Sequence, residues 1–138
     1  MRAARQVDVV LQNHTQELLT IEGGINIQGD WNPALGPPKI GSVVAKQGSV
    51  KWSTMTIEAN GPCEANVRLG CTKGYIEVHW LLPFAAEKFE MFNTAPAALE
   101  ITHRVGGPNY DYRVVLVTLT AKPKSAKEGL APGPAGPA

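Results

Sequence analysis

The sequence lacks a long hydrophobic run, an excess of charge of one sign and a signal-peptide pattern. Its longest apolar runs, such as 80–86, are far shorter than the roughly 20 residues of a membrane-spanning helix, so membrane contact is expected to be peripheral or to follow assembly. No apolar stretch follows the arginines of residues 1–6, which predicts no secretory signal peptide and a protein made in soluble form. The formal net charge is only +1, so no nucleic-acid partner is expected.

Cysteine is scarce as well. Cys63 and Cys71 flank a segment with strand character, and a strand of that length spans about 26 Å. A disulfide needs Cα atoms within roughly 7 Å of one another, so we predict two free thiols. Two cysteines without a histidine pair also make a poor zinc site, and no metal or other cofactor is expected.

Catalytic patterns are missing too. The three histidines, His14, His79 and His103, are isolated in the sequence, and no Gly-x-Ser-x-Gly pattern occurs. His79 has the polar parity of its strand, which favours a hydrogen-bonded or solvated ring over a general base. We therefore predict that the protein is not an enzyme.

Short β-like runs punctuated by glycine and proline fill the chain. The clearest run is Tyr75–Leu82, in which every second residue is apolar until Pro83 ends the strand. Gly23-Gly24 is expected to separate two strands at 18–22 and 25–28. The other expected strands lie at 7–11, 39–44, 50–57, 65–69, 99–105 and 110–119.

About ten short strands without a convincing helix predict an all-β fold, namely an antiparallel β-sandwich of two sheets. The only window that permits a helix is 85–92, and it is equally compatible with a strand. We expect one domain over residues 1–121. Residues 122–138 are rich in proline, glycine and alanine and have little apolar side chain to bury, so this tail is expected to be disordered.

The aromatic residues carry the remaining signal. Trp52 and Phe92 are interpreted as core residues, and Trp80 shares the inward parity of its strand, although it lies near the strand end. Trp31 lies in an expected loop, where a lid over the core and an exposed contact are equally compatible with the sequence. Phe84 follows a proline and is expected at the surface. Aromatic rings at one end of a β-scaffold suit a lipid headgroup region or a sugar face.

The order of these features resembles the aegerolysin family, especially the bacterial insecticidal members that form the smaller half of binary toxins. The resemblance spans residues 5–121. It is carried by Arg5-Gln6-Val7-Asp8-Val9, Asn13-His14-Thr15 with Leu18, Gly29-Asp30-Trp31 with Pro33, Ile40, Lys51-Trp52, the strand 75–80 followed by Pro83-Phe84 and Phe89, and the closing 112–117.

This resemblance implies a β-sandwich that recognises membrane lipid, such as sphingolipid with or without sterol. It also implies a larger, perforin-like partner that forms the pore. The chain would be soluble and cytoplasmic until release and would act at the membrane of a target cell. The lipid-binding residues expected on this basis are Trp31, Tyr75, Trp80, Phe84 and Phe89.

The alternative is a carbohydrate-binding lectin of the actinoporin-like β-sandwich type. Such lectins share the plan of a glycine-rich hairpin followed by a strand that ends in proline and an aromatic residue. Actinoporins themselves insert an N-terminal amphipathic helix, whereas Val7–Leu11 has β periodicity, which argues against pore formation of that kind.

Overall fold

The computed structural model describes residues 3–85 and 88–123, and every regular element in these ranges is a β-strand. The described part of the chain therefore holds no helix that could cross a membrane. The strands are β1 (Arg5–His14), β2 (Leu19–Gln28), β3 (Asp30–Trp31), β4 (Val43–Val44), β5 (Ser49–Thr56), β6 (Cys63–Cys71), β7 (Gly74–Leu82), β8 (Glu90–Thr94), β9 (Leu99–Asn109) and β10 (Tyr112–Ala121).

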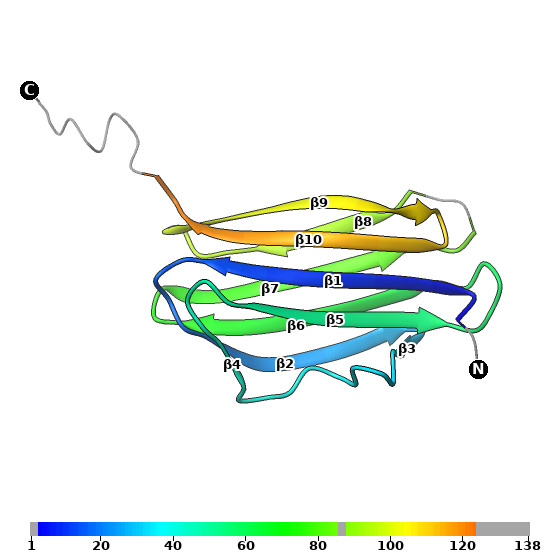
Figure 1. Ribbon diagram of the computed structural model, residues 1–138, viewed down its shortest axis with the longest axis horizontal. Coiled ribbons are helices and arrows are strands. Elements are labelled where there is room, and N and C mark those ends of the chain that lie inside the picture. The colour runs from blue at the N-terminus through cyan, green and yellow to red at the C-terminus, as the bar shows by residue number, and fades with distance from the viewer. Residues whose placement is uncertain (1–2, 86–87, 124–138) are drawn as a thin grey trace, which may run out of the picture.

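Two five-stranded sheets pack face to face (Figure 1). Sheet A has the strand order β3-β5-β1-β10-β9, and sheet B has the order β4-β2-β6-β7-β8. Neighbouring strands are antiparallel except for β1 and β10, which run parallel, with Val9 opposite Val115. A parallel pair needs a long connection between its strands, and here the rest of the sandwich supplies it. The predicted two-sheet β-sandwich is confirmed, with this one parallel pair in an otherwise antiparallel arrangement.

The core lies between the sheets and is built by period-two alternation on both inner faces. Trp80 is its largest fully buried side chain, and it stacks on Trp52 with ring centroids 6.4 Å apart and an interplanar angle of 13°. The Trp80 indole N–H donates to Thr54 Oγ1 at 2.9 Å, so burial leaves no unpaired donor. Each fully buried side chain of this size stabilises the fold by about 1.5–3 kcal/mol.

Several local predictions were wrong. Gly23-Gly24 does not interrupt β2, because the strand absorbs a register shift between Ile21 and Gly23 and continues to Gln28. The strand expected at 39–44 is reduced to Val43–Val44, because Gly41 adopts a φ of 89° and residues 39–42 form a turn.

Phe92 was expected in the core, yet its side chain is 52% exposed, because it lies on the outer face of sheet B opposite His79. The described part of the window 85–92 contains the start of β8 and no helix. β10 ends at Ala121, and the predicted disordered tail lies outside the described residues from 124 onward.

Candidate functional site

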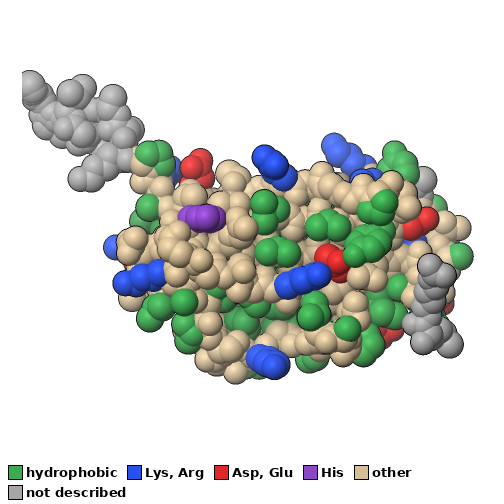
Figure 2. Space-filling view, in the orientation of Figure 1, with side chains coloured by type: hydrophobic (Ala, Val, Ile, Leu, Met, Phe, Trp, Pro, Cys, Tyr) green, Lys and Arg blue, Asp and Glu red, His purple; other side chains and the backbone are tan. Residues whose placement is uncertain are grey.

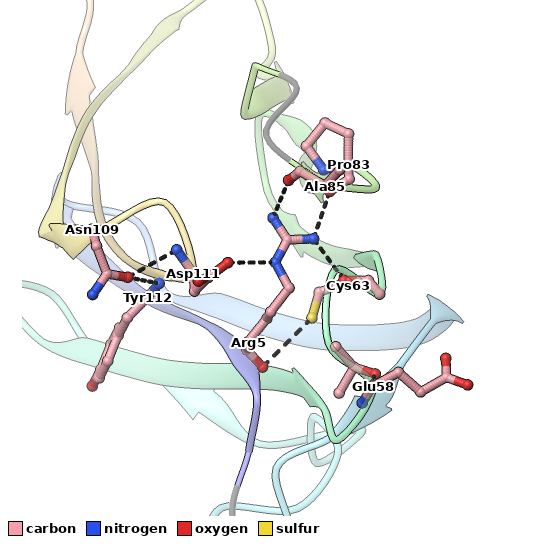
Figure 3. Close-up of polar contacts among 10 residues, drawn as sticks. Arg5, Glu58, Cys63, Pro83, Ala85, Asn109, Asp111 and Tyr112 are labelled. Atoms are coloured by element: carbon pink, nitrogen blue, oxygen red, sulfur yellow. Dashed lines mark hydrogen bonds and ion pairs between the residues drawn. The ribbon is translucent and has the colours of Figure 1, made fainter.

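A buried arginine organises one end of the sandwich (Figure 3). Arg5 opens β1, and its side chain is only 1% exposed. Its Nη1 donates to the carbonyl oxygens of Gly61 and Pro83, both at 2.7 Å, and its Nη2 donates to the carbonyl oxygen of Ala85 at 2.7 Å. Its Nε donates to Asp111 Oδ1 at 3.0 Å. One guanidinium thus joins the loop after β5, the segment after β7 and the turn before β10.

Backbone contacts reinforce this junction. Ala85 N–H donates to the carbonyl oxygen of Asn60 at 3.0 Å, and both residues adopt a positive φ, 59° for Ala85 and 64° for Asn60. Phe84 lies between the two carbonyls that Arg5 holds, and its side chain is 63% exposed. The fold therefore presents an aromatic ring to water from a backbone that is anchored on both sides.

Two further apolar side chains are exposed in the loops that Arg5 joins. Ile57 follows β5 and is 50% exposed, and Tyr110 precedes β10 and is 56% exposed. We call Ile57, Phe84 and Tyr110 the loop end; their loops lie at the end of the sandwich where the N-terminus is seen (Figure 1). On the broad face shown in Figure 2, by contrast, basic and acidic side chains are interspersed among the hydrophobic ones.

Cys63 lies beside the same junction. Its thiol is fully buried at the start of β6 and approaches the Arg5 carbonyl oxygen at 3.9 Å. Burial raises the pKa of Cys63 to about 11, although the charge of Arg5 acts in the opposite direction. A thiol in this state is protonated and inert at neutral pH, so Cys63 contributes packing rather than chemistry.

A cleft of about 520 Å³ opens next to the loop end, and its lining comes from the segment before β8, from β9 and from the start of β10. The lining residues are Lys88, Phe89, His103, Val105, Tyr110 and Arg113. We call this the β8–β9 cleft. It combines two cations and an imidazole with aromatic and aliphatic walls, a composition suited to a ligand with an anionic part and an apolar part.

The polar groups of the β8–β9 cleft are incompletely paired. The Arg113 guanidinium lies 4.8 Å from the centroid of the Tyr110 ring, and its Nε is buried without a hydrogen-bond partner in the described structure. Asn93 Nδ2 lies 3.2 Å from His103 Nδ1, and Asn93 Oδ1 is buried without a partner as well. Unpaired buried polar atoms are uncommon in folded proteins, so two of them beside one cleft point to a ligand.

The structure brings only some of the predicted residues together. Phe84 belongs to the loop end, and Phe89 is half-buried against the core while also lining the β8–β9 cleft. Trp31 lies in the short strand β3 rather than in the expected loop, because Asp30 and Trp31 pair with β5. Its ring is half-buried, with its centroid 6.2 Å from that of Trp80 in an edge-on arrangement, which supports its interpretation as a lid over the core.

Two predicted residues do not belong to this surface. The surface role expected for Trp80 is wrong, because its side chain is 0% exposed and forms the centre of the core. Tyr75 is 43% exposed, but it lies at the start of β7, at the opposite end of that strand from Phe84. Its ring packs under the guanidinium of Arg68, whose Cζ is 3.9 Å from the ring centroid.

Sequence reasoning missed Arg5, Ile57, Tyr110 and Arg113. The two arginines carried a signal that could have found them, since each occupies the inward parity of an apolar strand: Arg5 with Val7 on β1, and Arg113 with Val115 on β10. Ile57 and Tyr110 lie in loops, where no periodicity marks which side chains face water.

Comparison with known proteins supports the fold. No family model matches the sequence, and no curated protein is detectably similar to it in sequence. The structure resembles the crystal structure of the lipid-binding protein Nakanori, with a TM-score of 0.68, 10% sequence identity, and coverage of 86% of this chain and 71% of that chain. At this identity the similarity establishes a shared β-fold, and the aegerolysin resemblance stays a prediction.

Proposed function

We propose that this protein binds the lipid surface of a membrane through its loop end and acts by binding rather than by catalysis. The observation that carries this proposal is the Arg5 junction, which holds Phe84 exposed between two anchored carbonyls. Similarity to a fold that binds lipid in Nakanori supports it. The aegerolysin-like order of residues in the sequence is a second, independent support.

The physical basis is the transfer of apolar side chains out of water. A fully transferred ring of this size contributes about 1.5–3 kcal/mol, and an anchored backbone limits the conformational entropy lost on binding. Ile57 and Tyr110 add exposed apolar side chains at the same end of the sandwich, and a tyrosine hydroxyl can remain at the headgroup level.

The finer parts of the proposal follow the family resemblance. We propose sphingolipid, with or without sterol, as the membrane component, and a larger perforin-like protein as the partner that forms a pore. In this proposal the chain is soluble until its release from the producing cell and has little lytic activity alone.

The test is sedimentation with liposomes of varied sphingolipid and sterol content. Phe84→Ala should weaken binding by about ten-fold or more, since 1.4 kcal/mol corresponds to a factor of ten. Phe92→Ala is the matched control, because Phe92 is similarly exposed but lies on the outer face of sheet B. If the two variants lose affinity equally, or if the folded wild type binds no liposome, the loop end is not a membrane-binding surface. Lysis of cells by the purified chain alone would contradict the two-component part.

A groove on sheet B that has charged and amide side chains in its lining favours a lectin as the second candidate. It has a volume of about 210 Å³ and is lined by Glu22, Gly23, Gly24, Ile25, Asn66, Arg68 and Glu77. Carboxylate, amide and guanidinium groups side by side offer paired hydrogen bonds to sugar hydroxyls. Gly23 lines this groove, and a Cβ added there would meet nothing within 4 Å, so Gly23→Val places side-chain atoms in the groove from an open position. Saturable glycan binding that Gly23→Val abolishes, without binding to liposomes, would replace the lipid proposal by this one.

A further inference from the structure

The β8–β9 cleft has a one-sided charge. Lys88 and Arg113 are cations, His103 adds an imidazole, and no carboxylate lines the cleft in the described ranges 3–85 and 88–123. Among the described lining residues these two positive groups have no carboxylate partner, so they repel each other, and an anion that enters relieves this repulsion. The charge therefore selects for a ligand with net negative charge.

The donors of the cleft are oriented before any ligand arrives. The Tyr110 ring faces the Arg113 guanidinium at 4.8 Å, which holds the planar group in place, and the buried Nε of Arg113 has no partner in the described structure. A guanidinium presents its N–H groups as a fork that matches two oxygens of a phosphate. Because Nε is buried, the edge of the guanidinium that borders the cleft is the part that a ligand oxygen would meet.

His103 adds a further donor. The Asn93 amide nitrogen can only donate, so at 3.2 Å it donates to Nδ1 of His103, and the neutral ring then carries its proton on Nε2. Asn93 itself does not line the cleft; its amide acts from behind His103 and fixes which ring nitrogen carries the proton.

We propose that the β8–β9 cleft binds the phosphate of an anionic lipid headgroup, with Arg113, Lys88 and His103 as its ligands. We choose a lipid as the source of the phosphate because of where the cleft lies. Phe89 and Tyr110 line the cleft, and Tyr110 is also part of the loop end. The loop end faces the membrane under the proposed function, on which this inference rests. A zwitterionic phosphocholine fits less well. Its quaternary ammonium would find no carboxylate in the described lining, and Arg113 already occupies a face of the Tyr110 ring.

The matched pair of variants is Arg113→Gln and Arg104→Gln. Both remove one positive charge, but Arg104 is exposed on the face of β9 opposite His103, where it lines a shallow surface hollow with Leu116. Binding is measured with phosphatidylcholine vesicles that contain or lack phosphatidic acid, and with vesicles that carry oleate for negative charge without phosphate. Urea unfolding of each variant verifies the fold, and Lys88→Gln, an exposed position, serves as a second cleft variant.

We expect wild type to bind vesicles with phosphatidic acid more tightly than either of the other two kinds of vesicle. Arg113→Gln and Lys88→Gln should each weaken that binding by about ten-fold or more, whereas Arg104→Gln should change it less than about two-fold. Equal losses for Arg113→Gln and Arg104→Gln, or equal binding to oleate vesicles, would reduce the effect to general charge and overturn the cleft site. Binding to pure phosphatidylcholine as tight as to phosphatidic acid would overturn the headgroup class while leaving the proposed function intact.

A titration without membranes separates the two proposals. Inorganic phosphate at constant ionic strength is added to the free protein while the nuclear magnetic resonance signals of Tyr110 and His103 are followed. We expect these signals to shift in wild type and to shift much less in Arg113→Gln. Shifts without binding to these vesicles would assign the cleft to free phosphate and refute its lipid source, and only if the sphingolipid liposomes are not bound either would the proposed function fall as well. An absence of shifts in a protein that still binds vesicles through Phe84 would refute the cleft alone.

Discussion

The Arg5 guanidinium lies 3.0 Å from the Asp111 carboxylate, and this contact links the first strand of the chain to the turn before the last. The two side chains differ in environment, since Arg5 is 1% exposed and Asp111 is 58% exposed. Water therefore screens the ion pair, and the three carbonyl oxygens that Arg5 also reaches provide its buried partners. The conformation of the loop end thus depends on a residue outside its loops.

Arg5→Met should destabilise the protein by about 3 kcal/mol or more. The substitution leaves the carbonyl oxygens of Gly61, Pro83 and Ala85 without their buried donor, and each unsatisfied buried group costs about 1–3 kcal/mol. The measurement is urea unfolding at neutral pH.

Two controls apportion the effect of Arg5. Asp111→Asn removes only the exposed partner and should cost less than about 1 kcal/mol, and Arg104→Met changes an exposed arginine and should have a similarly small effect. A loss in Asp111→Asn as large as that in Arg5→Met would show that the ion pair, rather than the carbonyl contacts, holds the junction.

Acid should destabilise the protein partly through Asp8. Burial raises the pKa of this carboxyl, but hydrogen bonds from Ser53 (2.6 Å), Gln6 (2.8 Å) and Tyr112 (2.7 Å) outweigh burial and hold its pKa below the ordinary value of 3.8. A lowered pKa in the folded state contributes stability that is fully present above the unfolded value and is lost as the pH falls through the folded value. The free energy of unfolding should therefore decrease below about pH 4.

Tyr112→Phe tests this source of acid sensitivity. Without the phenol the pKa of Asp8 moves toward its ordinary value, so the variant should be less stable at neutral pH and should lose less stability on acidification than wild type does. Glu64 adds a second contribution: burial raises its pKa, while hydrogen bonds from Gln28 and His79 and the charge of His79 lower it on balance. Urea midpoints at pH 7 and pH 3 provide the measurement. An acid-side loss in Tyr112→Phe equal to that of wild type would assign the effect elsewhere.

Thr54→Val should cost about 1–3 kcal/mol, because it keeps the shape of the side chain but leaves the buried indole N–H of Trp80 without an acceptor. Thr54→Ser retains the hydroxyl and is the matched control for the hydrogen bond. Thermal unfolding and tryptophan fluorescence report the two effects. Equal stability of the Val and Ser variants would mean that the Trp80 donor finds another partner.

Periodicity in the sequence predicted most of the fold. Alternation along Tyr75–Leu82 identified β7 and the inward parity of Trp80, because a half-buried strand must place apolar residues on one side. It failed at Gly23-Gly24 and at 39–44, where bulges and turns depend on long-range hydrogen bonds such as Gly41 N–H to the Ile21 carbonyl. The parallel pairing of β1 with β10 depends on contacts across the whole chain, which local patterns do not encode.

The candidate site was less predictable. The proline before Phe84 correctly indicated an exposed ring, but aromatic content alone could not separate Trp80, which fills the core, from a surface residue. Tyr75 and Phe84 are close in the sequence, yet a strand lies between them and carries them to opposite ends. The unused signal was a charged residue at an inward position of an apolar strand, which would have marked Arg5 and Arg113 for attention.

The two cysteines should differ sharply in reactivity. They lie at opposite ends of β6 and are not disulfide-bonded, which confirms the free thiols predicted from the sequence. Burial raises the pKa of Cys63 to about 11, so at pH 8 its thiol is both protonated and inaccessible, whereas Cys71 is partly exposed beside the loop that joins β6 to β7.

A thiol reagent at pH 8 should therefore modify one cysteine in the folded protein and both in denaturant without reductant. Cys71→Ser should abolish the reaction of the folded protein, and Cys63→Ser should leave it unchanged. Rapid modification of Cys63 in the folded state would show that the Arg5 junction opens on the timescale of the reaction.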